Sequence, residues 1–358
     1  MIPDKYLNIS GRKIGLDEPV YFVADIAANH DGDLNRAIEL INLAAEAGAD
    51  AAKFQHFKAE TIVSDEGFNT LGGQLSHQSK WKKSVFEVYQ EAAVDLDWTP
   101  YLKKACDKAG IAFFTSPYAT ELVDAVDPYV PAYKIGSGDI TWLEIIEYIA
   151  RKNKPYFLAT GASTLQEVQN AVKVALKLNS KIALLQCNTN YTAKLENFQY
   201  IQLNVLKAYR EIYPDIVLGL SDHTPGHATV LGAVVLGARI IEKHFTDDTS
   251  REGPDHAFSM DSISWREMVD RTKELELSLG VDIKKVEDNE RETVVLQRRS
   301  IRLKKDLQEG ATLKKDNLTV LRPCPADALP PCEMDNVVGK QIKTQMKKGD
   351  CLRWSDIK

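Results

Sequence analysis

Short apolar runs rich in β-branched and aromatic residues alternate with helix-periodic stretches along the first three quarters of the chain. Amphipathic helical stretches begin at Leu34, Thr164 and Ser262. Eight strand–helix units within about 260 residues predict an α/β fold of the (β/α)8 TIM-barrel type, which typically needs about 250 residues. The eight apolar runs begin at Val20, Ala49, Ile111, Ala132, Pro155, Ile182, Ile216 and Arg239.

The apolar runs are nearly continuous rather than alternating, which is typical of a parallel sheet covered by helices. An open, doubly wound sheet is the alternative topology. It is disfavoured because no GxGxxG motif follows the first run, where a dinucleotide-binding fold would carry one.

The chain predicts two domains joined by a linker. Residues 1–280 form the barrel, the charged residues 281–297 form the linker, and residues 298–358 form a small, mostly β domain with glycine turns. Within the barrel, the segment from Lys58 to Trp98 is long for a strand-to-helix connection. In a barrel, a long loop at this position usually builds or covers the active site; the alternative is an insertion without function.

Composition narrows the function classes. The 358 residues carry a formal net charge of -6, with 44% apolar and 27% charged residues, so nucleic acid and anionic membranes are not expected partners. The five cysteines form no CxxC pair, and no apolar stretch reaches the roughly 18 residues of a membrane span. We expect a cytoplasmic protein.

Polar side chains crowd the C-terminal ends of the predicted strands, which converge on one face of a barrel. Leaving so many polar groups unpaired in a dry core would cost several kcal/mol each, so they should face a common ligand or each other. They are Asp25, Asn29, His30, Lys53, Gln55, Thr115, Ser116, Lys134, Ser137, Asp139, Thr160, Cys187, Ser221, Asp222, His223, Glu242, Lys243 and His244.

Two neighbouring runs end in histidine, at His223 and His244. Neutral imidazoles on adjacent strand ends suit a divalent metal whose other positions hold water or substrate oxygens. Lys53 and Lys134 lie among apolar neighbours and require an anion. They could bind a phosphate or carboxylate together with serine hydroxyls, pair with strand-end carboxylates, or form a Schiff base as in class I aldolases.

The ordered motifs ADIAANHDGD at Ala24, AGADAAKFQ at Ala47, FFTSPY at Phe113, PAYKIGSGD at Pro131, GLSDHT at Gly219, EKHFTD at Glu242 and GPD at Gly253 resemble the sialic acid (N-acetylneuraminate) synthase family. They span the barrel almost end to end. The tail resembles the SAF, or antifreeze-like, domain that completes these enzymes.

This resemblance implies a metal-dependent condensation of phosphoenolpyruvate with an N-acylated amino-hexose to a nine-carbon 2-keto-3-deoxy sugar acid and phosphate. The implied metal is Mn²⁺, with Mg²⁺ or Co²⁺ as alternatives, and the implied assembly is a domain-swapped homodimer. The alternatives are a Schiff-base pyruvate aldolase, another 3-deoxy-sugar acid synthase or a non-enzymatic carbohydrate-binding protein.

The resemblance also implies roles for individual residues. His223 and His244 match the metal ligands, and Arg322 matches an arginine that reaches the neighbouring subunit's site. The phosphoenolpyruvate set is Lys53, Ser116, Lys134, Ser137 and Ser221; the catalytic set is Asp25, Asp139, Glu242 and Asp255; the sugar-binding set is Tyr118, Tyr191 and Arg322.

Four positions depart from the family pattern. Asp25 and Asp139 stand where the family usually has Glu, which shortens each side chain by about 1.5 Å. The segment from Gln186 departs from an HCTxxYP-like pattern, and Ala159 replaces a usual serine. Because these changes fall where sugar or water is handled, we expect an acceptor other than N-acetylmannosamine, such as a diacetamido-trideoxyhexose.

Overall fold

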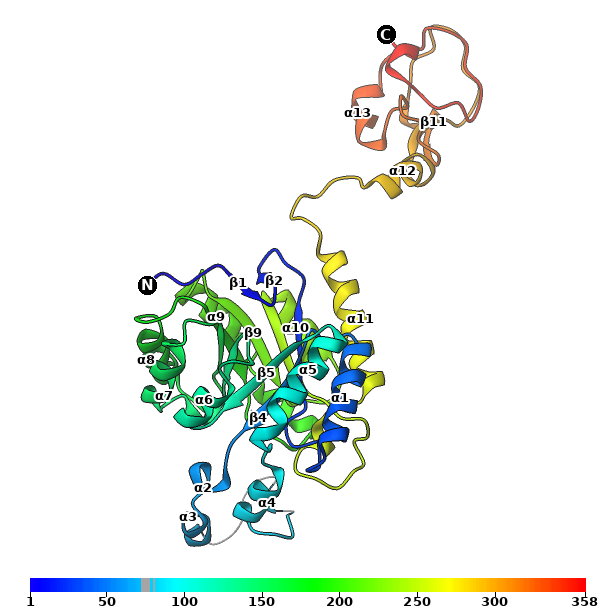
Figure 1. The fold of residues 1–358 in the computed structure, drawn as a ribbon. Helices are drawn as coiled ribbons and strands as arrows, with labels where there is room; N and C mark the ends of the chain where they lie inside the picture. Colours follow the sequence, from blue (N-terminus) through cyan, green and yellow to red (C-terminus); the bar gives the residue numbers. More distant parts are fainter. Residues whose placement is uncertain (72–77, 80) are drawn as a thin grey trace. The chain divides into compact units, whose positions relative to one another are not determined.

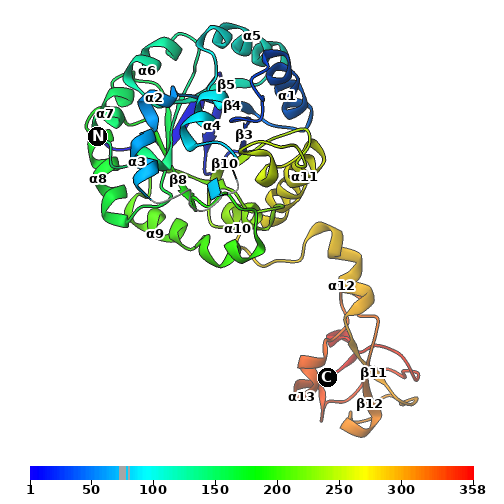
Figure 2. The same cartoon turned by 90° about the horizontal axis from the view of Figure 1, so that it is seen from below.

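The structure is a computed structural model that describes residues 1–71, 78–79 and 81–358. It divides into two compact units, Met1–Gly280 and Val281–Lys358. The first unit is a closed parallel barrel surrounded by helices, and Figure 2 views this ring of helices end on. The prediction of a TIM barrel is therefore confirmed, and each of the eight apolar runs overlaps a barrel strand.

The barrel closes where the last strand pairs with the first, with Ile240 opposite Tyr21. Every neighbouring pair of strands is parallel, and each strand is fully or almost fully buried because helices cover the outside while side chains fill the inside. The strands, seen in Figure 1, are β3 (Tyr21–Asp25), β4 (Ala51–His56), β5 (Ala112–Pro117), β6 (Tyr133–Ile135), β7 (Tyr156–Ala159), β8 (Ile182–Cys187), β9 (Val217–Asp222) and β10 (Ala238–His244).

Side chains cap the start of three covering helices, α1, α8 and α11. Asp33 caps the first helix by accepting from the amides of Asn35 and Arg36, and Thr164 and Glu167 form a capping box. The helices are α1 (Leu34–Glu46), α5 (Thr99–Ala109), α6 (Thr120–Val126), α7 (Leu143–Ala150), α8 (Leu165–Ala175), α9 (Val205–Ile212), α10 (Ala228–Val235) and α11 (Ser262–Leu279).

An N-terminal hairpin that our strand analysis did not include precedes the barrel. It comprises β1 (Tyr6–Ile9) and β2 (Arg12–Gly15), joined by Ser10 and Gly11, both with positive φ. Leu7, Ile9 and Ile14 are buried in one cluster with inward-facing barrel residues such as Tyr21 and Phe114. The hairpin therefore extends the interior core of the barrel. Its alternating pattern and Ser-Gly turn are the sequence signals that could have revealed it.

The long connection after β4 contains short helices. They are α2 (Ala59–Ile62), α3 (Asp65–Thr70) and α4 (Val85–Ala92), of which α2 and α4 pack together. Ser84 and Glu87 form a capping box at the start of α4. Part of the glycine-containing stretch singled out in this segment, residues 72–77 and 80, lies outside the described residues.

The second unit has its own small core around Ile301, Leu313 and Ile342. It contains α12 (Arg291–Gln297), β11 (Ser300–Leu303), β12 (Leu318–Leu321) and α13 (Met334–Val337), with β11 antiparallel to β12. Residues 281–297, predicted as a charged linker, thus include one helix. The two similar tail blocks lie against each other through a bridge between Leu307 and Met346.

Among the described residues, no helix combines the length and the apolar character needed to cross a membrane.

Candidate active site

One cavity of about 450 Å³ opens at the C-terminal ends of the barrel strands. Thirteen residues placed in the site by sequence reasoning or by the resemblance line it: Asp25, Lys53, Gln55, Tyr118, Lys134, Ser137, Asp139, Cys187, Tyr191, Ser221, His223, Glu242 and His244. Asp255, on the loop after β10, completes the predicted set in this wall. The strand ends thus converge as the barrel geometry requires.

Strand register explains why these side chains meet. Asp25 of β3 lies opposite Lys53 of β4 and opposite His244 of β10. Glu242 of β10 lies opposite Ser221 of β9. Because alternate residues of a strand point to opposite faces, Glu242 and His244 face the interior together.

The floor of the cavity is a buried cluster of lysines and carboxylates. Lys53 Nζ lies 2.6 Å from Asp25 Oδ2 and 3.6 Å from Glu242 Oε1, and Lys134 Nζ donates to Glu242 Oε1 at 2.8 Å. Ser221 donates to the same Glu242 oxygen at 3.1 Å. Both lysines therefore form ion pairs with strand-end carboxylates, as one of our alternatives proposed.

These contacts set the protonation of the cluster. Burial by itself lowers the pKa of Lys53, but the carboxylates of Asp25 and Glu242 outweigh it and raise that pKa. For Glu242, burial raises the pKa, but the two lysines dominate and bring it to about 2. Lys53 is accordingly an ammonium and Glu242 a carboxylate.

Two imidazoles border this cluster, and His244 Nε2 lies 3.6 Å from Asp25 Oδ2. The His223 and His244 ring centroids are 5.4 Å apart. His223 Nδ1 lies 3.0 Å from the Asn188 carbonyl, which can only accept, so this nitrogen carries the proton. Tyr191 and Phe258 pack edge-on against the rings, with Tyr191 4.4 Å from His223 and Phe258 4.8 Å from His244, centroid to centroid.

The histidine pair fits a divalent metal. Nδ1 of His244 is buried and has no hydrogen-bond partner among the described residues, although Asp255 Oδ2 approaches it to 4.0 Å. Burial lowers the pKa of His244 to about 3, which keeps the ring neutral as a ligand must be. Across the described chain, no group of three or more His, Cys, Asp or Glu forms a complete metal site. Water or substrate oxygens would have to complete the coordination.

Two further carboxyls line the cavity, and neither has a lysine partner within ion-pair distance among the residues that the structure describes. Burial raises the pKa of Asp139 to about 6. It also raises the pKa of Asp255 to about 6, while the Ala28 amide acts in the opposite direction. A carboxyl with a pKa near neutrality can accept or release a proton under physiological conditions.

Some predicted residues lie elsewhere. Ser116 is buried but does not line the cavity, and its hydroxyl has no partner among the described residues. Asp222 and Lys243 pair with each other at 2.5 Å outside the cavity, because they alternate with inward-facing residues. His30 is also outside; it packs edge-on against Trp98 with centroids 5.6 Å apart. Arg322 is exposed in the second unit.

The cavity also includes residues that sequence reasoning did not name. Thr189 and Pro254 come from loops, and a group from the β4–β5 connection is largely apolar. The length of that connection was the available signal, and the structure places its residues in the cavity lining. The group comprises Phe57, Ile62, Gln78, Trp81, Val88, Tyr89 and Ala92.

Comparison with known proteins identifies the family of the chain. Residues 40–284 match the NeuB family and residues 298–358 match the SAF domain. The chain is 33% identical to N,N'-diacetyllegionaminic acid synthase of Legionella pneumophila over 362 residues, covering 97% of this chain and 99% of that protein. It is 33% identical to pseudaminic acid synthase of Helicobacter pylori over 345 residues, covering 95% and 98%.

A solved structure is also similar. The N-acetylneuraminic acid (sialic acid) synthetase of Leptospira borgpetersenii serovar Hardjo-bovis, crystallised with citrate, superposes with a TM-score of 0.71 at 26% identity. The match covers 82% of this chain and 96% of that one. The resemblance predicted from the motifs is confirmed: the chain is an enzyme of the NeuB family, with a C-terminal SAF domain.

Proposed function

We propose that this protein condenses phosphoenolpyruvate with an N-acylated amino-hexose, with the help of a divalent metal, to give a nine-carbon 2-keto-3-deoxy sugar acid and phosphate. The observation that carries the proposal is the single cavity in which Lys53, Lys134 and two serines face His223 and His244. Such a cavity would place the cations that bind the anionic enol ester next to the ligands of a metal that binds the aldehyde, so the two substrates would meet in one site.

The phosphoenolpyruvate half of the site uses Lys53, Lys134, Ser137 and Ser221. The ammonium groups act as point charges for phosphate and carboxylate, and the hydroxyls donate hydrogen bonds. The raised pKa of Lys53 favours this role over a Schiff base, because a protonated amine is not a nucleophile. The lysines' present carboxylate partners, Asp25 and Glu242, hold them in place.

Charge balance supports both a metal and a cation from outside the barrel. Among the described residues, the cavity lining includes four carboxyls, Asp25, Asp139, Glu242 and Asp255, and two lysines. When all are ionised, this leaves an excess of two negative charges, which would repel a substrate carrying phosphate and carboxylate. A divalent ion on His223 and His244 offsets that excess. Arg322, from the second unit of a partner subunit, would supply further positive charge.

The chemistry follows from these positions. A bound divalent metal supplies Lewis acidity toward the aldehyde of an open-chain sugar. The methylene carbon of phosphoenolpyruvate forms a bond to the aldehyde carbon, leaving an oxocarbenium centre that water attacks. The tetrahedral adduct then expels phosphate by C–O cleavage. Asp139 and Asp255 have pKa values suited to moving the protons of these steps.

The acceptor end of the cavity favours a deoxygenated, N-acylated sugar. Phe57, Ile62, Val88 and Tyr89 give this part an apolar wall. Apart from the Tyr89 hydroxyl, such a wall offers no hydrogen-bonding side chain to sugar hydroxyls, and it packs against acetamido and C6 methyl groups. A diacetamido-trideoxyhexose presents more methyl surface and fewer hydroxyls than N-acetylmannosamine. The similarity to a legionaminic and a pseudaminic acid synthase supports the same class of acceptor.

Phosphate release tests the proposal. Purified protein is assayed with Mn²⁺, phosphoenolpyruvate and either N-acetylmannosamine or a 2,4-diacetamido-2,4,6-trideoxyhexose. We expect release that requires an acceptor, is higher with the diacetamido sugar and is lost in chelator. A preference for N-acetylmannosamine would reject the proposed acceptor. Borohydride trapping of pyruvate on a lysine would reject the reaction type.

A further inference from the structure

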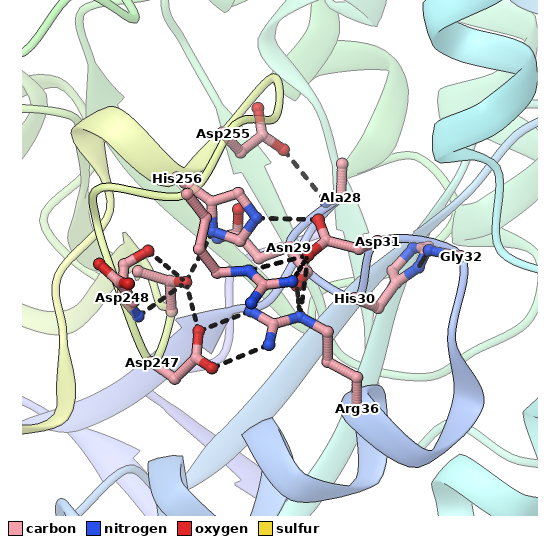
Figure 3. Close-up of polar contacts among 12 residues, drawn as sticks. Ala28, Asn29, His30, Asp31, Gly32, Arg36, Asp247, Asp248, Asp255 and His256 are labelled. Atoms are coloured by element: carbon pink, nitrogen blue, oxygen red, sulfur yellow. Dashed lines mark hydrogen bonds and ion pairs between the residues drawn. The ribbon is translucent and has the colours of Figure 1, made fainter.

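Asp255 is held by the loop that follows β3. Its Oδ2 accepts from the Ala28 amide at 3.1 Å, and its carbonyl accepts from the Ser259 hydroxyl at 2.7 Å. The Asn29 side-chain amide in turn donates to Ser259 Oγ and to the Phe245 carbonyl, both at 2.8 Å. Figure 3 shows the Asp255 carboxylate pointing back to Ala28. The loops after β3 and β10 thus form one hydrogen-bonded unit.

The neighbour of Asp255, His256, is buried completely and bonded at both ring nitrogens. Nε2 lies 2.9 Å from Asp31 Oδ1 and Nδ1 lies 2.7 Å from the Thr246 hydroxyl. Because a carboxylate only accepts, Nε2 donates to Asp31. A Cβ on Gly253 would lie 2.7 Å from His256 Cδ2, so the loop backbone packs directly against the ring. The ring has little room to turn.

Asp31 is itself anchored from two sides, as Figure 3 shows. Arg251 donates to Asp31 Oδ2 at 3.0 and 2.6 Å, and Arg36 Nε lies 3.1 Å from the same oxygen. Arg36 also forms a two-pronged pair with Asp247 at 2.8 and 2.5 Å. Partial burial raises the pKa of Asp31, but hydrogen bonds from His256 and Arg251 outweigh it and lower that pKa.

We infer that Asp31 and His256 are a positioning pair that holds the Asp255 carboxylate at the cavity wall and thereby sets the binding of the acceptor sugar. The inference rests on the proposed function, in which Asp255 moves protons, and adds that it does so on the acceptor sugar. Asp31 and His256 do not line the cavity, so they act through Asp255 rather than on substrate. The two lysines and the serines of the phosphoenolpyruvate end lie on other strands and are not part of this network.

The consequence is a selective kinetic effect. Displacing a reacting group by about 1 Å can cost up to about 100-fold in rate, so we expect a 10- to 100-fold loss in kcat/KM for the acceptor when the pair is broken. The KM for phosphoenolpyruvate should change less than about twofold. If the pair only stabilised the fold, its loss would reduce the amount of folded enzyme and would affect the kinetics of the two substrates equally.

Variants of the full chain test the pair with Mn²⁺, phosphoenolpyruvate and the preferred acceptor. His256→Leu and Asp31→Ala should show the acceptor-specific loss. His256→Gln keeps a hydrogen-bond donor for Asp31. On a logarithmic scale, its loss in acceptor kcat/KM should be at most half of the loss in His256→Leu. Asp270→Asn is the matched control, because it breaks an aspartate–arginine pair within α11, with Arg266, that shares no residue with this network. It should change acceptor kcat/KM less than about twofold.

The outcomes separate the inference from the proposed function. If Asp255→Asn leaves the acceptor kinetics unchanged, the role proposed for Asp255 is wrong, and the inference falls with it. If Asp255→Asn impairs acceptor use but His256→Leu and Asp31→Ala do not, only the positioning pair is rejected. An equal loss for both substrates also rejects it. Should His256→Leu fail to fold, Asp31→Ala carries the test of the acceptor-specific loss, and His256→Gln remains the variant expected to retain acceptor use.

Discussion

Removing the Glu242 carboxylate should expose the electrostatic cost of the buried cluster. Glu242 is 3% exposed and is the carboxylate that pairs with Lys134, which is also 3% exposed. Lys53 retains Asp25 when Glu242 is neutral, whereas Lys134 loses its counter-ion. Because Glu242→Gln preserves side-chain volume, it creates no cavity, and the cost is that of a buried unpaired charge. This cost is about 3–5 kcal/mol in the free energy of unfolding.

Urea denaturation of chelator-treated protein, followed by circular dichroism of the barrel helices, measures this cost. Glu274→Gln is the matched control, because Glu274 is 58% exposed and pairs with Arg271 on the surface; we expect a change of about 0–1 kcal/mol. Adding Lys134→Met to Glu242→Gln removes the unpaired charge and should restore most of the loss. A Glu242→Gln cost no larger than the control's, or no rescue by Lys134→Met, would refute the reasoning.

Three further outcomes follow from the structure. Burial raises the pKa of Asp139 from 3.8 to about 6, so the folded state binds more protons and loses up to about 3 kcal/mol of stability as pH rises from 4 to 7. In urea titrations, Asp139→Asn should therefore stabilise the protein at pH 7 but not at pH 4. Equal effects at the two pH values would contradict this reasoning. Measured by calorimetry, His244→Ala should lower the affinity for Mn²⁺ about 100-fold or more. His227→Ala is the control, because His227 lies outside the cavity, and it should leave the affinity unchanged. Unaltered affinity in His244→Ala would exclude the histidine site. Arg322→Ala should lower turnover at least tenfold while the oligomeric state by light scattering is unchanged, and full activity would show that the arginine has no role in the site.

The linear pattern was sufficient for the barrel and for most of the site. Continuous apolar runs specify strands covered on the outside and filled on the inside, and polar residues at their ends can only meet at one rim. Asp25, Lys53, Glu242 and His244 were assigned to the cavity on that basis, and all line it. The N-terminal hairpin was missed because its four-residue strands carry too short an alternation to stand out from a terminal segment.

Some features depended on which way each side chain points and on contacts between distant segments. Asp222 and Lys243 lie at strand ends next to Ser221 and His244. Because alternate side chains of a strand point to opposite faces, Asp222 and Lys243 point away from the cavity and form an ion pair with each other. Composition could not reveal that Lys53 and Lys134 would be paired with carboxylates, since pairing depends on distances across the barrel.

The sequence by itself determined the fold class, the family and the strand ends that carry the chemistry, because these depend on local periodicity and ordered motifs. Only the tertiary structure decided which of those groups share a cavity, how their charges are shared, and that Asp31 and His256, 225 residues apart, join two loops behind Asp255. Such contacts arise from closure of the barrel, which brings the first and last strands side by side and so couples segments that no local pattern connects.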